Sequence, residues 1–162
     1  MNNLNIRPVE LKDLEALSEI YCKVYEAFNV GERWDQASAY KLLRHWFERQ
    51  PDLCFLAELD GKIVGAFVAA IKPWWDGNRL VDGEIFVDSD YQKRGVGTEL
   101  SKKMYRSAIE KYNAKCFDTY TFSGSEHPLS WYKKQGFIEN NDWTNISGNL
   151  KEILKNLEKN DK

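Results

Sequence analysis

The chain has 162 residues, of which 43% are apolar, and a net charge of −2, so it can build one domain with a sizeable core and is not a disordered chain. The near-neutral charge and the lack of a long basic run argue against a nucleic-acid binder, and no apolar run approaches the ~20 residues of a membrane helix. Three scattered cysteines and two histidines predict neither a disulfide framework nor a metal site, and without a signal peptide we expect a cytoplasmic protein.

Hydrophobic periodicity and turn signals predict the elements of the first half of the chain. They are, in order, a strand over 3–7, a helix over 10–28, a helix over 35–49, and strands over 53–58 and 62–72. Asp35 is a candidate N-cap for the second helix, and Asp60-Gly61 is a hairpin turn signal between the two later strands.

The same patterns predict the elements of the second half. They are a loop over 73–78, a strand over 79–87, a helix over 96–112, a strand over 114–121, a short helix from Pro128, short strands over 137–139 and 143–146, and a final helix from Asn149. Asn113 and Gly136 suit left-handed helix ends, and Asn149 with Glu152 is typical of a helix start. The resulting order is β-α-α-β-β-β-α-β-α-β-β with an added C-terminal helix.

The stretch from Gln92 to Thr98 lies between a predicted strand and a predicted helix. The first N–H groups of a helix have no partner inside it, and the helix dipole adds a partial positive charge there. Gly95 lets the backbone approach a ligand closely, while Lys93 and Arg94 add positive charge. The stretch therefore predicts an anion site, most naturally for phosphate. It matches neither the nucleotide-triphosphate loop nor the dinucleotide fingerprint.

The six residues Gln92-Lys93-Arg94-Gly95-Val96-Gly97 resemble the Gln/Arg-x-x-Gly-x-Gly/Ala signature of the GNAT superfamily of N-acetyltransferases. The resemblance implies that this turn, together with Thr98, holds the pyrophosphate of acetyl-CoA. No metal is implied.

The order of the elements is also similar to the GNAT order, over residues 3–146. This implies an α/β (α+β) fold in which a mixed, mostly antiparallel central sheet is flanked by helices, and a single domain over 1–162. Residues 147–162 depart from the family order as a helical extension. This extension either covers the core or forms a contact in a homodimer.

A second motif, Ser130-Trp131-Tyr132-Lys133-Lys134-Gln135-Gly136-Phe137, is similar to the GNAT ending Phe-Tyr-x-x-x-Gly-Phe. The resemblance implies that Tyr132 protonates the departing CoA thiolate, since a phenol beside the sulfur can supply the proton. The alternative is a helix tyrosine that only packs on the sheet.

Acetylation of an amine also calls for a base, because an amine attacks a thioester only when it is unprotonated. Alternation along the strand over 79–87 places Asp82 and Glu84 on one face. Several GNAT enzymes use a glutamate of this strand, so Glu84 is the candidate. It either takes the proton, attracts a cationic substrate, or is only a solvated strand residue.

The resemblance further implies main-chain contacts at the end of this strand. The backbone of Ile85, Phe86 and Val87 would pair with the pantetheine arm of acetyl-CoA. One N–H there would polarise the thioester carbonyl, which is oxyanion-type stabilisation.

Candidates for the acceptor site combine aromatic rings with acids: Trp34, Trp74, Trp75, Asp76 and Asp82. Aromatic faces and carboxylates together favour a cationic amine. For each residue the plain alternative is an ordinary surface or core position. The pattern does not name the acceptor, which could be an antibiotic, a polyamine, an amino acid or a protein terminus.

The sequence thus predicts an acetyltransferase that moves the acetyl group of acetyl-CoA to a primary amine of a small cationic molecule or peptide by direct attack. Glu84 and Tyr132 are its predicted catalytic residues. Two alternatives stay open: a non-catalytic CoA-binding regulatory module with the same fold, and an acyltransferase that uses longer acyl-CoA.

Overall fold

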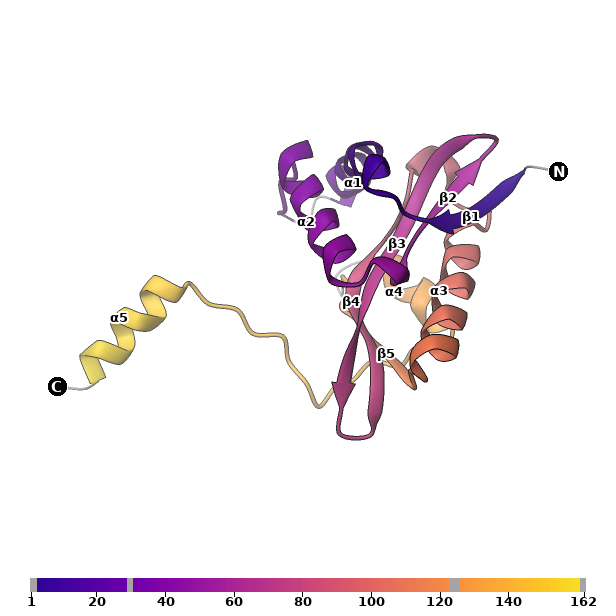
Figure 1. Ribbon diagram of the computed structural model, residues 1–162. Coiled ribbons are helices and arrows are strands. Elements are labelled where there is room, and N and C mark those ends of the chain that lie inside the picture. Colours follow the sequence, from indigo (N-terminus) through magenta and orange to yellow (C-terminus); the bar gives the residue numbers. More distant parts are fainter. Residues whose placement is uncertain (1–2, 29–30, 123–125, 161–162) are drawn as a thin grey trace. The chain divides into compact units, whose positions relative to one another are not determined.

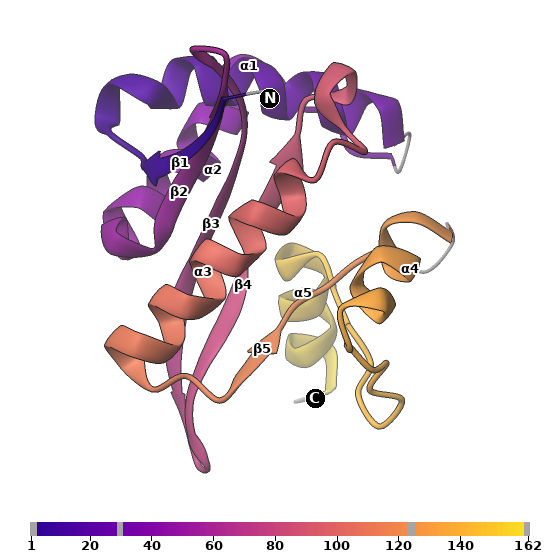
Figure 2. The ribbon, with the colours of Figure 1, turned by 90° about the vertical axis from the view of Figure 1, so that its right-hand side faces the viewer.

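The computed structural model describes residues 3–28, 31–122 and 126–160, with the side chains of Asp82 and Asn160 outside the description. The chain divides into two compact units, Met1–Tyr120 and Thr121–Lys162, and each is described by itself. The first unit is a sheet covered by helices on both faces, and the second contains two helices (Figures 1 and 2).

The sheet of the first unit has five strands in the described chain, in the order β1-β2-β3-β4-β5. They are β1 Leu4–Pro8, β2 Cys54–Leu59, β3 Lys62–Trp74, β4 Gly77–Val87 and β5 Cys116–Asp118. β1 to β4 pair antiparallel, and β5 pairs parallel with β4. This confirms the predicted mixed, mostly antiparallel sheet.

Helices lie on both faces of this sheet. α1 Leu14–Phe28 and α2 Gln36–Arg49 cover one face, and α3 Val96–Tyr112 covers the other (Figure 1). Short 3-10 turns span Leu11–Asp13, Pro51–Leu53 and Ser89–Tyr91. The core under α1 and α2 includes Leu17, Leu43 and Val68, and the core under α3 includes Phe67, Leu100 and Met104. Each such buried side chain contributes about 1.5–3 kcal/mol relative to an exposed one.

The helix ends of the first unit follow local rules that the sequence already shows. Asp35 Oδ1 accepts the Ser38 N–H at 2.7 Å and caps α2. Gly95, with φ of +82°, precedes α3, and Asn113, with φ of +51°, ends it. All three ends are as predicted, because a cap depends on only a few neighbouring residues. The predicted first helix differs, since a 3-10 turn replaces its first residues.

The hairpin between β3 and β4 is longer than predicted. A loop is predicted over 73–78, but the ladder continues to the pair Trp74↔Gly77, and only two residues remain in the turn. Arg79 donates to Asp76 Oδ2 at 3.0 Å across this tip. Cross-strand pairs of side chains can stabilise a two-stranded ribbon beyond the point where turn signals in the sequence predict a loop.

A bulge interrupts β4. Val68 of β3 pairs with Glu84, yet Ala70, two residues later, pairs with Val81, three residues earlier. Gly83, with φ of +91°, accommodates the extra residue. Val81 and Glu84 therefore face the same side of the sheet although they are three residues apart. The simple alternation predicted for this strand is wrong for this physical reason.

The second unit contains α4 Glu126–Lys134 and α5 Leu150–Asn160. Asn149 Oδ1 accepts the N–H of Lys151 at 3.0 Å, which confirms the predicted start of the final helix. The strands predicted over 137–139 and 143–146 do not occur among the described residues. Short extended segments form strands only where another strand supplies the hydrogen bonds, and the structure pairs neither segment with a strand.

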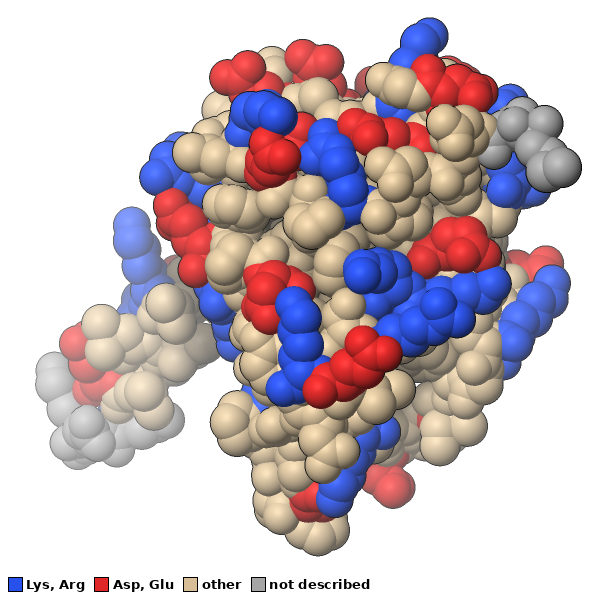
Figure 3. Space-filling model, turned by 45° about the vertical axis from the view of Figure 1, so that its right-hand side comes forward, with Lys and Arg blue, Asp and Glu red and all other residues tan. Residues whose placement is uncertain are grey.

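Two global properties of the described residues bear on partners. On the face drawn in Figure 3, Lys and Arg side chains are interspersed with Asp and Glu side chains. None of the described helices has both the length and the apolar character that crossing a bilayer requires.

Candidate active site

The carboxylate of Glu84 is held by two tyrosines of α1. Tyr25 donates its hydroxyl to Glu84 Oε2 at 2.8 Å, and Tyr21 donates to the same oxygen at 3.1 Å. The tyrosines are one helical turn apart, so both side chains lie on the same face of α1, and their rings stack with centroids 4.2 Å apart. The half-buried Glu84 therefore has a fixed orientation beside an aromatic surface.

Both phenols are poor acids in this environment. Burial raises the pKa of Tyr21 and of Tyr25, and the charge of Glu84 raises both further. The two hydroxyls therefore keep their protons at neutral pH and act as hydrogen-bond donors. Donors of this kind stabilise a carboxylate in its charged form.

Further aromatic residues extend this cluster. The Trp34 ring meets Tyr21 edge-on with centroids 5.2 Å apart, and the Phe28 ring lies 5.9 Å from that of Tyr25. Trp34 Nε1–H donates to Glu32 Oε2 at 2.8 Å. Of the predicted acceptor residues, Trp34 thus lies with the Glu84 cluster, and Glu32 adds a second carboxylate at its rim.

The turn from Gln92 to Gly97 presents the first backbone N–H groups of α3. Its N-cap, Gly95, has no side chain to accept these N–H groups, and the space where a Cβ would stand is open within 4 Å. Lys93 has a φ of +60°, and the Lys93 and Arg94 side chains are exposed. The turn combines uncapped N–H groups, a helix dipole and two cations, which are the features that bind phosphate.

The end of β4 has a strand partner on one edge only among the described residues. β5 pairs with β4 over Arg79–Val81, so the strand predicted over 114–121 is shorter than expected. β5 ends at Asp118, the partner of Val81, so β4 beyond its bulge at Gly83 has no pairing with β5. Ile85, Phe86 and Val87 pair with β3 alone. An extended ligand can add to such an edge through main-chain hydrogen bonds.

Three predicted acceptor residues lie elsewhere. Trp74, Trp75 and Asp76 are at the tip of the β3–β4 ribbon, at its far end from Glu84 (Figure 1). The strand between Gly77 and Glu84 covers about 23 Å when extended. Trp75 is 86% exposed, and Asp76 is bonded to an arginine. The structure does not bring these three residues to the Glu84 cluster.

The predicted proton donor Tyr132 lies in α4 of the second unit. Its side chain is 7% exposed, and its ring packs edge-on against Trp131 and Phe137, with centroids 5.0 Å and 5.1 Å apart. The Phe137 N–H donates to the Tyr132 carbonyl oxygen at 3.2 Å, and Gly136 between them has a φ of +96°. The second motif therefore folds back on itself and fixes the tyrosine ring.

Sequence reasoning does not assign a site role to Tyr21 or Tyr25. Their spacing of four residues on a helix is the ordinary signal of a core-facing stripe. Only the packing of α1 against β4 brings both hydroxyls to Glu84. The one sequence signal that could have marked them is the hydroxyl group that each tyrosine places on the otherwise apolar face of the helix.

Comparison with known proteins gives consistent matches. The model of the acetyltransferase (GNAT) family matches residues 14–137. An uncharacterised N-acetyltransferase of Methanocaldococcus jannaschii is 30% identical over 138 residues, which are 83% of this chain and 60% of that protein. This chain therefore spans less than two thirds of that relative's length.

Solved structures agree in fold. A possible acetyltransferase from Clostridium difficile 630 has a TM-score of 0.74 at 15% identity, covering 91% of this chain and 97% of that chain. The aminoglycoside N-acetyltransferase AAC(6')-Iy in complex with CoA has a TM-score of 0.71 at 18% identity, covering 93% and 97%. At these identities the likeness shows the fold alone. The family match spans more than half of the chain, including Glu84 and the glycine turn, and the chain belongs to the acetyltransferase (GNAT) family.

Proposed function

We propose that this protein transfers the acetyl group of acetyl-CoA to a primary amine of a small cationic molecule or peptide. The observation that carries the proposal is the arrangement along β4. An oriented carboxylate, Glu84, stands three residues before the end of the strand, and the uncapped start of α3 follows the next turn. A segment that holds an amine near Glu84 and the CoA diphosphate at the following turn suits transfer of the acetyl group from the CoA thioester to that amine.

The residues of the turn fit the cofactor that the family uses, acetyl-CoA. The N–H groups from Gly95 to Thr98 and the cations Lys93 and Arg94 would hold its diphosphate. The unpaired edge of Ile85–Val87 would hold the pantetheine arm by main-chain hydrogen bonds. When bound, acetyl-CoA supplies an activated thioester. The fit rests on an N-cap with no side chain and open space beside it.

The Glu84 cluster supports a cationic acceptor. A carboxylate attracts an ammonium group directly, and the rings of Tyr25 and Trp34 add attraction for a cation, worth about 0.5–2 kcal/mol per favourable contact. Glu32, bonded to Trp34, places further negative charge at the rim. An amine with a second positive group would gain from both acids.

The proposed chemistry assigns one proton to each catalytic residue. Glu84 removes a proton from the acceptor ammonium, directly or through water, or holds the cation while water removes it. The amine nitrogen forms a bond to the acetyl carbon, and the carbon–sulfur bond breaks. Tyr132 donates a proton to the thiolate, and the second proton that the amine nitrogen loses returns through water to the Tyr132 oxygen. A backbone N–H near Ile85–Val87 stabilises the oxyanion, and groups of this kind commonly contribute about 10²-fold or more each.

A thiol-release assay with a panel of amines tests the proposal. The panel includes an aminoglycoside, a polyamine, amino acids and a short peptide with a free N-terminus. CoA binding is measured separately by calorimetry. Turnover with a cationic amine is expected. Binding without turnover on any amine indicates a regulatory module, and preference for a longer acyl-CoA indicates a different acyltransferase.

Replacing the proton donor tests the mechanism within the same assay. Tyr132→Phe is expected to lower kcat by about 10²-fold or more, because the thiolate loses its acid. CoA affinity should be nearly intact. Tyr120→Phe, which changes an exposed tyrosine, is the control. An unchanged kcat in Tyr132→Phe removes that residue from the mechanism.

A further inference from the structure

A lysine of α1 is bonded to the turn that follows β4. Lys23 Nζ donates to Asp88 Oδ1 at 2.6 Å and to Asp90 Oδ2 at 2.7 Å. Asp88 is largely buried, with 15% of its side chain exposed, while that of Asp90 is 73% exposed. One cation therefore spans two carboxylates in the short segment between the carboxylate site and the phosphate-type site.

Asp88 makes most of the hydrogen bonds that hold this segment. Its N–H donates to the Val64 carbonyl oxygen at 2.8 Å, its carbonyl oxygen accepts the Tyr91 N–H at 2.8 Å, and its carboxylate accepts the Asp90 N–H at 3.0 Å. The Gln92 side chain then donates to the carbonyl oxygen of the last β4 residue at 2.9 Å. These polar contacts define the path of the chain into the exposed turn over 92–95.

The same helix holds both halves of the candidate site. Tyr21 and Tyr25 of α1 bond to Glu84, and Lys23 between them in sequence bonds to Asp88, four residues after Glu84. A shift of α1 relative to β4 would move both halves together. A charge-assisted hydrogen bond is shorter and stronger than a neutral one, so the lysine is suited to fix this relation.

We propose that Lys23, acting through Asp88, is a positioning residue that pre-organises the N–H groups at the start of α3 for the diphosphate of CoA. This proposal rests on the proposed function, because it assumes that CoA binds at this turn. Pre-organisation lowers the ordering cost of binding, so its loss weakens the ligand without removing any direct contact.

If Lys23 acted only by electrostatic attraction of CoA, the expected change in CoA affinity for Asp88→Ala would have the opposite sign. If Lys23 only attracted an anion, then Asp88 would repel it, and Asp88→Ala would tighten CoA binding. If Lys23 positions the turn, Asp88→Ala weakens binding although it removes a negative charge. The double variant separates the two cases further, since positioning predicts that Lys23→Met adds little once Asp88 is gone.

The experiment measures CoA affinity by calorimetry for the full chain, with folding checked by thermal unfolding. Lys23→Met and Asp88→Ala should each weaken CoA by about tenfold, and Lys23→Arg should restore near-normal affinity. Arg44→Met, which breaks an exposed ion pair on α2, is the charge-matched control and should change nothing. Without CoA, hydrogen exchange of the Glu99 amide, which donates to the Gly95 carbonyl oxygen at 3.0 Å, should speed up in both single variants.

The outcomes separate the two levels of the argument. A wild-type chain that fails to bind CoA overturns the proposed function. A wild-type chain that binds CoA, with Asp88→Ala equal or tighter and exchange unchanged in Lys23→Met, overturns the positioning role while leaving the proposed function intact.

Discussion

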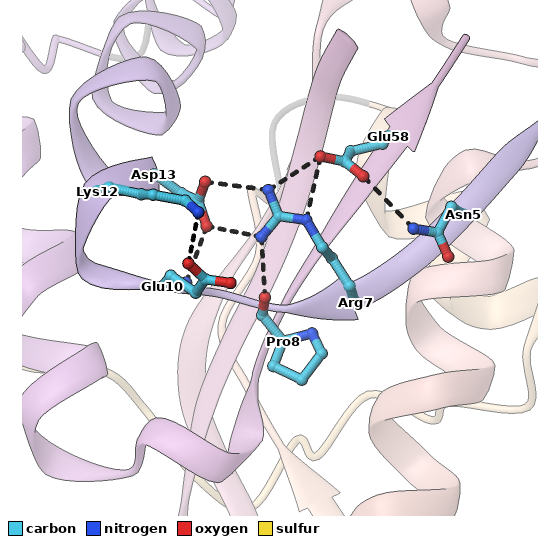
Figure 4. A network of polar contacts seen from close by, with 7 residues as sticks. All are labelled: Asn5, Arg7, Pro8, Glu10, Lys12, Asp13 and Glu58. Carbon is cyan, nitrogen blue, oxygen red and sulfur yellow. Dashed lines mark hydrogen bonds and ion pairs between the residues drawn. The ribbon is translucent and has the colours of Figure 1, made fainter. Parts of the chain in front are cut away.

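Two half-buried glutamates of the same sheet, Glu58 on β2 and Glu84 on β4, are held in different ways. Glu58 shares the guanidinium of Arg7 with Asp13, and all five N–H donors of that arginine are engaged, the fifth by the Pro8 carbonyl oxygen (Figure 4). Glu84 instead receives two phenol hydroxyls. The first carboxylate meets a charge of opposite sign, and the second meets neutral donors.

The difference separates a structural ion cluster from a candidate catalytic group. In the Arg7 cluster the guanidinium lowers the pKa values of both carboxyls, first through its hydrogen bonds. It joins β1, β2 and the 3-10 turn that precedes α1. Phenols orient Glu84 without bringing a positive charge of their own. A carboxylate oriented in this way suits an incoming ammonium group, and the following changes test the contrast.

The largest expected effect is on catalysis, from Glu84→Gln. The amide keeps an acceptor for the tyrosine hydroxyls but can no longer take a proton, so kcat/KM at neutral pH should fall by about 10²–10⁴-fold. The optimum should move to higher pH, because the acceptor must then lose its proton to solvent. Glu58→Gln is the matched control and should leave the pH–rate profile unchanged. An identical profile for Glu84→Gln would count against the base role.

The next effect concerns the bulge that sets the direction of Glu84. A Cβ at Gly83 would collide with the carbonyl oxygen of Val68, and the φ of +91° is already unfavourable for alanine. Gly83→Ala should lower the free energy of unfolding by about 2–4 kcal/mol, from strain and overpacking together. Gly61 also has a positive φ, of +80°, but a Cβ there would meet nothing within 4 Å. Urea unfolding of Gly61→Ala should therefore show a loss of only about 1 kcal/mol in the free energy of unfolding. Equal losses in both variants would contradict the bulge argument.

A smaller effect on stability is expected from Arg7→Met. Two carboxylates lose their shared partner, at a cost of about 2 kcal/mol in the free energy of unfolding at neutral pH. Because the folded-state pKa values of Asp13 and Glu58 lie below their ordinary values of 3.8 and 4.5, this stabilisation is complete above those values. It is lost as pH falls through the lower folded-state values.

Denaturation of wild type and Arg7→Met across pH 3–7 measures this dependence. The two curves should lie furthest apart near neutrality and converge in acid. The kinetic constants at neutral pH should agree between the two proteins. A constant gap across the whole range would contradict the ionic origin of the difference. Arg44→Met, at an exposed pair, should show little change at any pH.

The smallest effect is expected from Tyr25→Phe. It removes one hydroxyl bonded to Glu84 while keeping the ring. The lost hydrogen bond is worth about 1 kcal/mol, so kcat/KM for the amine should fall several-fold. CoA affinity should not change, since the phosphate-type turn is separate from this hydroxyl. A loss confined to CoA binding would show that the tyrosine acts on the turn instead.

Local chemistry explains which parts were predictable. The caps at Asp35 and Asn113, the hairpin turn at Asp60 and the glycine turn before α3 each depend on a few adjacent residues, and all occur as predicted. The β3–β4 tip was mispredicted because cross-strand pairing continued past Pro73. The strands expected over 137–139 and 143–146 are absent from the part of the chain that the structure describes, since a strand depends on a partner that the pattern does not contain.

The residue sequence by itself determined the family, the order of elements as far as α4 and the glycine turn, and it singled out Glu84 as the candidate carboxylate. These follow from neighbours along the chain, where φ preferences and hydrogen bonds act over a few residues. Only the tertiary structure decided that a bulge redirects β4, that two tyrosines hold Glu84 and that Lys23 reaches Asp88. The two tyrosine bonds and the lysine bond each join segments more than fifty residues apart, whose contact is set by the packing of α1 on the sheet. The bulge depends on the register of β3 against β4, which no local pattern sets.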